Sequence, residues 1–142
     1  MIWGVDFHPL RPEVAAVPSG DKTLRVVDLR QLTVAATLSF EDEVHSAAFS
    51  PSGLTLAVGV VDVFRVELFD PETWVRLRTI PTNASPRWLG WLSEGRLVVC
   101  MGPFFRKHPV LPASMQVFEV ETGVDEMRAG FDGDKPVNVQ VK

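Results

Sequence analysis

The chain has 142 residues, which is enough for one ordinary domain with a sizeable core. Hydrophobic residues make up 46% and charged residues 23% of it, a balance that excludes a disordered chain, and no apolar run is long enough to span a membrane. The net charge of −4 argues against a broad nucleic-acid or membrane surface, and the single cysteine, Cys100, excludes internal disulfides and multi-cysteine metal sites.

The N-terminus, MIWGVDFHPLRP, contains an acid and prolines where a signal peptide has a charged start and a long apolar core. Secretion is therefore not indicated. A lone cysteine also agrees with a reducing compartment. We expect a cytoplasmic protein.

Three copies of one pattern follow one another along the chain. Phe7, Phe49 and Trp91 are spaced 42 residues apart, and other columns keep this step: Val5, Ala47 and Leu89; Val14, Leu56 and Val98; Ala16, Val58 and Cys100. A period of about 40 to 45 residues is typical of propeller blades with four strands each. The sequence predicts an all-β fold, a partial β-propeller of three four-stranded antiparallel blades plus a C-terminal strand.

The copies divide a single repeat domain over residues 1–142 into blade 1 at about 2–42, blade 2 at about 43–85 and blade 3 at about 86–133. The first strands are expected at 3–7, 45–49 and 87–91, and Pro- and Gly-containing turns follow them. The second strands, at 14–17, 56–61 and 97–101, are apolar on both faces, as strands between neighbouring sheets are. The fourth strands, at 33–38, 75–80 and 124–129, are more polar, as outer strands should be.

The third strands share an order of apolar, polar, apolar, apolar and acidic residues. They are LRVVD (24–28), VELFD (66–70) and MQVFE (115–119). Asp28, Asp70 and Glu119 therefore recur at equivalent positions. Because a catalytic acid is needed only once, this recurrence favours hydrogen bonding within the following turns.

These residues resemble the WD-repeat β-propeller family. The resemblance lies in FHP and FSPSG after the first strand, LAVG in the second, and VVDL, LFDPETW and VFEVETG around the third. It covers about residues 2–131, although the Trp-Asp pair of the family is replaced by Val27-Asp28, Phe69-Asp70 and Phe118-Glu119. It implies a non-enzymatic scaffold that binds protein or peptide partners at its rim and channel mouth, without a cofactor.

Two irregular segments interrupt the repeat. The first, GPFFRKHPVLPAS (102–114), contains an insertion of seven residues, and we expect a stiff exposed loop. Exposed aromatic residues beside arginine are typical of binding hot spots, so partner binding is predicted at six residues: Phe104, Phe105, Arg106, Lys107, His108 and Trp88. The alternative is that the two phenylalanines form a local cap. The second segment, about 136–142, reads as an extra strand that opens a fourth copy.

Three blades are too few to close a ring, because known rings have about four blades or more. The outer faces of the first and third blades would expose apolar surface, at a cost on the order of 10 kcal/mol. Three solutions remain open. The chain forms a homo-oligomer, it is a fragment whose remaining blades lie in another propeller chain or were removed, or its sheets pack back as a sandwich.

Catalytic motifs are missing from the sequence, which has no phosphate-binding loop, HExxH or GxSxG. His8, His45 and His108 are scattered, and we expect turn or strand-edge residues rather than ligands. Cys100 lies in an apolar strand and is expected to be a buried, inert thiol. The rival hypothesis is a propeller hydrolase, lactonase or small-ligand binder with a site in the channel. Its candidate acid is Asp6, but Ala48 and Gly90 occupy the matching positions.

Overall fold

The computed structural model of the chain describes residues 1–102, 113–132 and 135–141, and in this part of the chain every regular element is a strand. The first sheet contains β1 (Asp6–Phe7), β2 (Val14–Pro18), β3 (Thr23–Asp28) and β4 (Thr33–Ser39). The second contains β5 (Val44–Phe49), β6 (Leu56–Val60), β7 (Arg65–Phe69) and β8 (Arg76–Pro81). The third contains β9 (Ser85–Ser93), β10 (Arg96–Gly102), β11 (Ser114–Glu119), β12 (Val124–Asp132) and β13 (Lys135–Val141).

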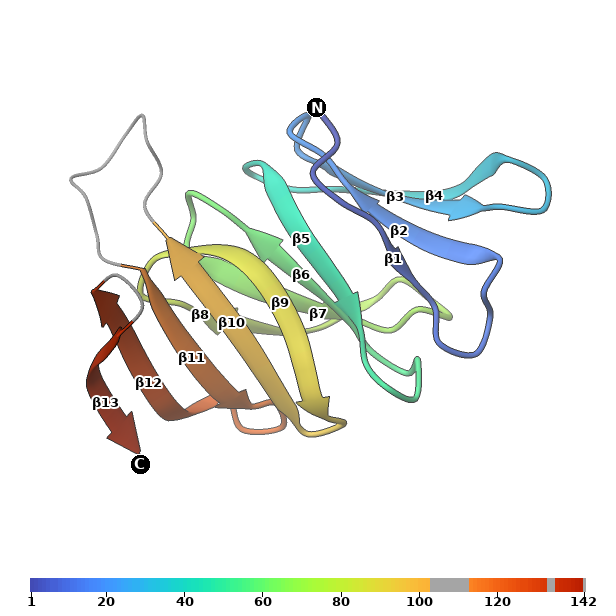
Figure 1. Ribbon diagram of the computed structural model, residues 1–142. Coiled ribbons are helices and arrows are strands. Elements are labelled where there is room, and N and C mark those ends of the chain that lie inside the picture. Colours follow the sequence, from blue (N-terminus) through green and yellow to red (C-terminus); the bar gives the residue numbers. More distant parts are fainter. Residues whose placement is uncertain (103–112, 133–134, 142) are drawn as a thin grey trace.

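Each sheet is an antiparallel meander, in which consecutive strands pair with one another. The three sheets lie side by side in sequence order, with the first sheet and the third sheet at the two ends (Figure 1). The predicted fold class is confirmed: the protein is all-β, and three consecutive sheets form a partial propeller with an added C-terminal strand. The described residues contain no helix long and apolar enough to cross a membrane.

Polar side chains organise the turns after the third strands, as the sequence predicts. Asp28 accepts hydrogen bonds from the backbone N–H groups of Arg30 and Gln31, at 2.9 and 3.2 Å. Asp70 and Glu119 accept equivalent bonds from residues two or three positions later. An Asx-type turn satisfies the backbone locally, so it forms wherever the acid recurs.

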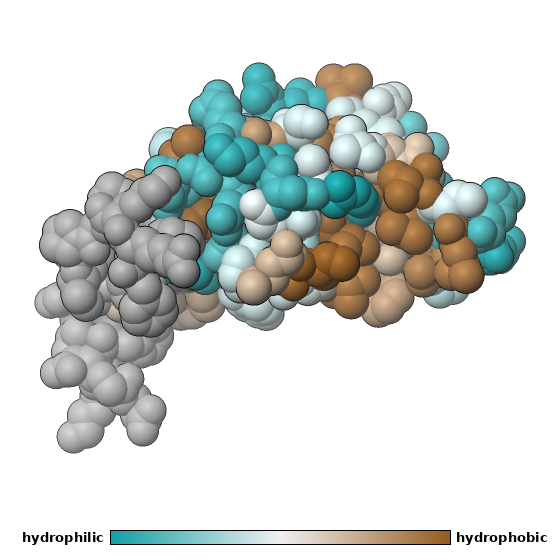
Figure 2. All heavy atoms as spheres, turned by 90° about the horizontal axis from the view of Figure 1, so that it is seen from above, coloured by the Kyte–Doolittle hydropathy of each residue, from teal (hydrophilic) through white to brown (hydrophobic). Residues whose placement is uncertain are grey.

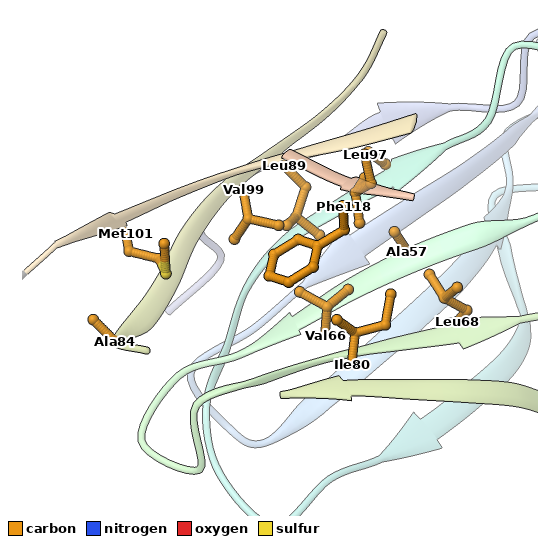
Figure 3. Close-up of a cluster of buried hydrophobic side chains, with 11 residues drawn as sticks. Ala57, Val66, Leu68, Ile80, Ala84, Leu89, Leu97, Val99, Met101 and Phe118 are labelled. Carbon is orange, nitrogen blue, oxygen red and sulfur yellow. The ribbon is translucent and has the colours of Figure 1, made fainter. Parts of the chain in front are cut away.

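The core consists of two layers between neighbouring sheets. Between the first and second sheets, the layer joins Ala16 and Leu24 to Phe49, Leu56 and Phe69. Between the second and third sheets, a larger set packs together, as Figure 3 shows: Ala48, Ala57, Val66, Leu68, Ile80, Ala84, Leu89, Leu97, Val99, Met101 and Phe118. All five residues of β6 are buried because this central strand is covered on both faces.

The pairing of the second strands differs from the expected columns. Asp6, Ala48 and Gly90 are 42 residues apart, but the residues that pair with them are Ala16, Ala57 and Val98, at a step of 41. Two of the expected repeat columns are therefore wrong. They are the column of Val14, Leu56 and Val98 and the column of Ala16, Val58 and Cys100. The reason is the turn after the first strand, which becomes one residue shorter in each successive copy. A shift of one residue moves a side chain to the opposite face of a strand.

The C-terminal strand is present, but it does not open a fourth copy. β13 pairs antiparallel with β12, for example through Met127 and Val141, and becomes the fifth strand of the third sheet. An adjacent antiparallel strand needs only a short hairpin connection, whereas a new sheet must be reached across an interface. The expectation of an opening strand is therefore wrong.

The two end sheets each have one face that no other described element covers. The open face of the first sheet contains the paired row Phe7, Ala15, Val27 and Val34. The open face of the third sheet contains Trp88, Gly90, Val98, Cys100, Met115 and Val117. Hydrophobic side chains gather on the half of the molecule that holds the first sheet (Figure 2). The sandwich alternative does not occur, because the end sheets do not pack back on each other (Figure 1).

Candidate functional site

A pocket of about 290 Å³ lies where the first strands of the three sheets approach one another. Its wall is formed by the segment before β2, the end of β2, strand β5 and strand β9, namely by Trp3, Gly4, Val5, Asp6, Pro18, His45, Ser46, Ala47, Ala48, Arg87, Trp88 and Leu89. Strand β5 contacts both β1 and β9. The pocket therefore depends on the packing of consecutive sheets.

Three of these residues form a continuous row across the sheets. The rings of Trp3 and His45 lie with their centroids 4.2 Å apart, and Nδ1 of His45 is 3.3 Å from Nη1 of Arg87. The three residues are 42 positions apart in the sequence. Equivalent repeat positions, on β5, on β9 and on the segment that leads into β1, therefore touch in space, and a repeat column becomes one side of the pocket.

The contacts of His45 determine which of its nitrogens carries the proton. Arginine can only donate, so Nδ1 accepts from Arg87, and Nε2 donates to Oε2 of Glu43 at 2.9 Å. Burial lowers the pKa of His45, and the charge of Arg87 lowers it further, while the contact with Glu43 raises it. The ring is thus held in its neutral form at neutral pH.

The first strands are also joined by hydrogen bonds from one sheet to the next. The carboxylate of Asp6 accepts from the backbone N–H of Phe49 at 2.8 Å, and Oγ of Ser46 accepts from the N–H of Leu89 at 3.1 Å. The indole N–H of Trp91 donates to the carbonyl of Ala48 at 3.0 Å. These contacts bind each sheet to the next one along its inner edge.

Among the predicted partner-binding residues, Trp88 is the one that the structure describes. It lies in β9, its side chain is 57% exposed, and it pairs directly with Cys100 on β10. Phe104, Phe105, Arg106, Lys107 and His108 lie outside the described residues. Their proximity to Trp88 remains a prediction.

Trp3, His45 and Arg87 were not among the predicted site residues. Their 42-residue spacing was a usable signal, because it is the spacing of the repeat itself. The residue types differ completely between copies, however, so the column carries no shared chemistry that the sequence alone makes visible. Only the contact between first strands brings the three together.

The remaining candidates have structural surroundings. His8 lies in the turn after β1, and its Nδ1 accepts from the N–H groups of Leu10 and Arg11, as expected of a turn residue. Cys100 is half-buried rather than fully buried, and burial raises the pKa of its thiol. In the part of the chain that the structure describes, no three His, Cys, Asp or Glu side chains converge as metal ligands would.

Comparison with known proteins finds relatives that match part of this chain. No protein-family model matches the chain. Among the curated proteins that match it is Coronin-7 of Rattus norvegicus, a WD-repeat protein, with 38% identity over 102 residues. The aligned part covers 71% of this chain but only 10% of Coronin-7, so the chain spans about a tenth of the length of this relative.

Proposed function

We propose that this chain is a non-enzymatic, WD-repeat-like β-propeller module for protein–protein interaction or assembly in the cytoplasm. Its ring is completed by a second copy of the chain or by another propeller chain. The partial match to Coronin-7, a WD-repeat protein, supports a propeller scaffold.

One observation supports the proposal most strongly. A face of the second sheet is buried inside the molecule, and the equivalent face of the first sheet is uncovered. Phe49 begins a row with Leu56 and Phe69 that packs against the first sheet, and its exposure is 7%. Phe7 begins the equivalent row on the open face of the first sheet, and its exposure is 52%. Apolar surface of this kind favours association, because burial removes it from water.

The test is the mass of the protein in solution. Sedimentation velocity should show a defined oligomer rather than the 15.7 kDa monomer, and Phe7→Asp should shift it toward the monomer because it places a charge in the interface. Leu54→Asp is the matched control, since Leu54 is 69% exposed in a turn of the second sheet. Equal loss of assembly in both variants would contradict a role for the open face.

A second part of the proposal concerns the inserted segment. We place partner binding on Phe104, Phe105, Arg106, Lys107 and His108 together with Trp88, because these residue types dominate binding hot spots. The double variant Phe104→Ala and Phe105→Ala should lose a specific partner in quantitative affinity purification while keeping the wild-type melting temperature. An insoluble variant would instead assign the two phenylalanines to the fold.

The alternative function is a small-ligand binder or hydrolase with a channel site, and the pocket beside His45 and Arg87 is the observation in its favour. Its catalytic form is weakened because the Asp6 carboxylate is already bonded to the N–H of Phe49. A propeller hydrolase with a divalent metal should melt at a higher temperature in calcium. We expect no shift.

A further inference from the structure

The two internal interfaces follow a common rule at their inner edge. An aromatic residue of the incoming first strand donates a hydrogen bond to the residue 43 positions earlier, on the preceding first strand. Phe49 meets Asp6, through its backbone N–H, and Trp91 meets Ala48, through its indole N–H. Phe49 and Trp91 occupy the same repeat column, and Phe7 is the third member of that column.

The third sheet offers the corresponding acceptor position on its open face. Gly90 pairs with Val98 just as Ala48 pairs with Ala57, so Gly90 is the equivalent small residue. The position is nevertheless filled. A Cβ atom on Gly90 would lie 2.8 Å from Cζ3 of Trp88 and closer still to Cη2, so the indole ring rests directly on the glycine. Trp88 comes from the same strand, two residues earlier.

We propose that Trp88 occupies the aromatic acceptor site over Gly90, and that assembly with a second copy of this chain requires Phe7 of that copy to displace it. The inference rests on the proposed assembly function and specifies how it is regulated. The chain carries both halves of the contact, namely an uncovered aromatic residue on the first sheet and a small-residue position on the third. Joined in this way, copies associate head to tail.

The exposures of the two aromatic residues indicate how such an exchange would work. Trp88 remains 57% exposed while it covers Gly90, and Phe7 is 52% exposed on its own sheet. Neither is fully buried in the separate molecule, so pairing removes further apolar surface from water. Trp88 competes with the incoming ring and thereby lowers the apparent affinity, because only molecules with the site vacated can accept a partner.

The hydrogen-bonding groups at this edge also distinguish the third sheet from the other two. Asp6 and Ser46 supply side-chain acceptors to the next first strand, whereas the equivalent positions on β9 are Gly90 and Trp88. A second copy would therefore gain the aromatic contact without an acceptor from these two side chains. The interface should be weaker and more easily reversed than the two internal ones.

The experiment compares self-association of the wild-type chain and Trp88→Ala by sedimentation velocity over a concentration series. We expect the substitution to tighten self-association by about tenfold, as it would if the vacated form makes up about a tenth of the wild-type population. Adding Phe7→Asp should abolish the gain. Leu54→Ala removes an apolar side chain elsewhere that is even more exposed, at 69%, and should leave association unchanged. Trp88→Gln provides a second variant should the alanine variant fold poorly.

Cys100 supplies an independent readout, because it is the only cysteine of the chain and pairs directly with Trp88 on the same face. Iodoacetamide should label Cys100 faster in the monomeric double variant Trp88→Ala, Phe7→Asp than in the single variant Phe7→Asp. Iodoacetamide should label Cys100 more slowly in assembled Trp88→Ala than in the double variant Trp88→Ala, Phe7→Asp, because assembly covers the face that carries Cys100.

The possible outcomes separate the two proposals. If the wild-type chain assembles and Trp88→Ala assembles equally or more weakly, the role of Trp88 is overturned and the assembly function stands. If neither protein associates at any concentration, self-assembly is overturned, and the role of Trp88 falls with it. Tighter association of Trp88→Ala that survives Phe7→Asp would also overturn the inference, since the displaced site would then accept something other than Phe7.

Discussion

The carboxylate of Asp6, at the start of the first sheet, accepts a hydrogen bond of 2.8 Å from the backbone N–H of Phe49 in the second sheet. Phe49 is 7% exposed, so water has little access to this N–H. The bond thus joins two sheets at the edge where their first strands meet. It also assigns a structural role to the acid that a catalytic reading of the sequence would have placed in the channel.

Replacing Asp6 with alanine should lower the free energy of unfolding by about 1–3 kcal/mol, because a buried N–H loses its acceptor. Asp6→Asn keeps an oxygen at the same position and should cost less. Glu94→Ala is the control, since Glu94 accepts from the Ser52 hydroxyl at 2.8 Å on an exposed turn, where the loss should be below about 1 kcal/mol. Urea unfolding measures all three, and equal losses for Asp6→Ala and Glu94→Ala would contradict the assignment.

Gly53 is expected to be intolerant of any side chain. Its φ is +73°, and a Cβ atom would overlap the His8 ring, lying 2.6 Å from Nε2. Gly53→Ala should destabilise the fold by about 1–2 kcal/mol from the backbone alone, with the overlap adding to this loss.

Two comparisons isolate the cause of that loss. Gly95 has open space around it, so Gly95→Ala should change the free energy of unfolding by less than about 0.5 kcal/mol. In a His8→Ala background, the overlap disappears and Gly53→Ala should cost less than it does in the wild-type chain. An undiminished cost would show that the ring of His8 is not responsible.

Stability should fall as the pH decreases from about 7.5 toward 5. The pKa values of His8 and His45 are lowered, chiefly by burial, so the unfolded chain binds protons first in this range and proton uptake favours unfolding. Above about pH 7.5, these histidines are neutral in both the folded and the unfolded chain, and the stability should be constant. The slope should not exceed about 1.4 kcal/mol per pH unit for each histidine.

Substitution of these histidines tests the origin of the slope. His45→Gln retains an acceptor for Arg87 and a donor for Glu43, and His8→Asn retains an acceptor for the turn; each variant should show a smaller slope. Carboxylates such as Glu119, whose pKa is lowered by hydrogen bonds from Thr122, contribute chiefly below about pH 5.5. Chemical unfolding at several pH values provides the measurement. If the dependence of stability on pH is unchanged in the double variant His8→Asn, His45→Gln, the assignment to these two residues is refuted.

The predictions that succeeded depended on local chemistry. Asp28, Asp70 and Glu119 were correctly predicted as turn residues because an acid bonds to N–H groups two or three positions later, whatever surrounds it. The pairing of Ala16, Ala57 and Val98 was missed because a turn that loses one residue shifts the pairing without disturbing the hydrophobic pattern of a strand that is apolar on both faces. The strand at the C-terminus was predicted correctly, but its pairing with β12 was not predicted.

The candidate site was predicted less completely than the fold. Trp88 was identified from its residue type and neighbours, whereas its position over Gly90 depends on a strand conformation that composition does not reveal. Trp3, His45 and Arg87 share a repeat column, yet their contact arises only when neighbouring first strands pack side by side.

By itself, the sequence determined that the chain forms strands, that these strands repeat three times, and which acids close the turns. Each of these properties follows from residues close together in the chain, through side-chain alternation and turn chemistry. The tertiary structure alone decided which faces are covered, which first-strand residues meet, and that Trp88 rests on Gly90. Those relationships depend on how one sheet packs on the next, and a distance between sheets is not encoded in any single stretch of residues.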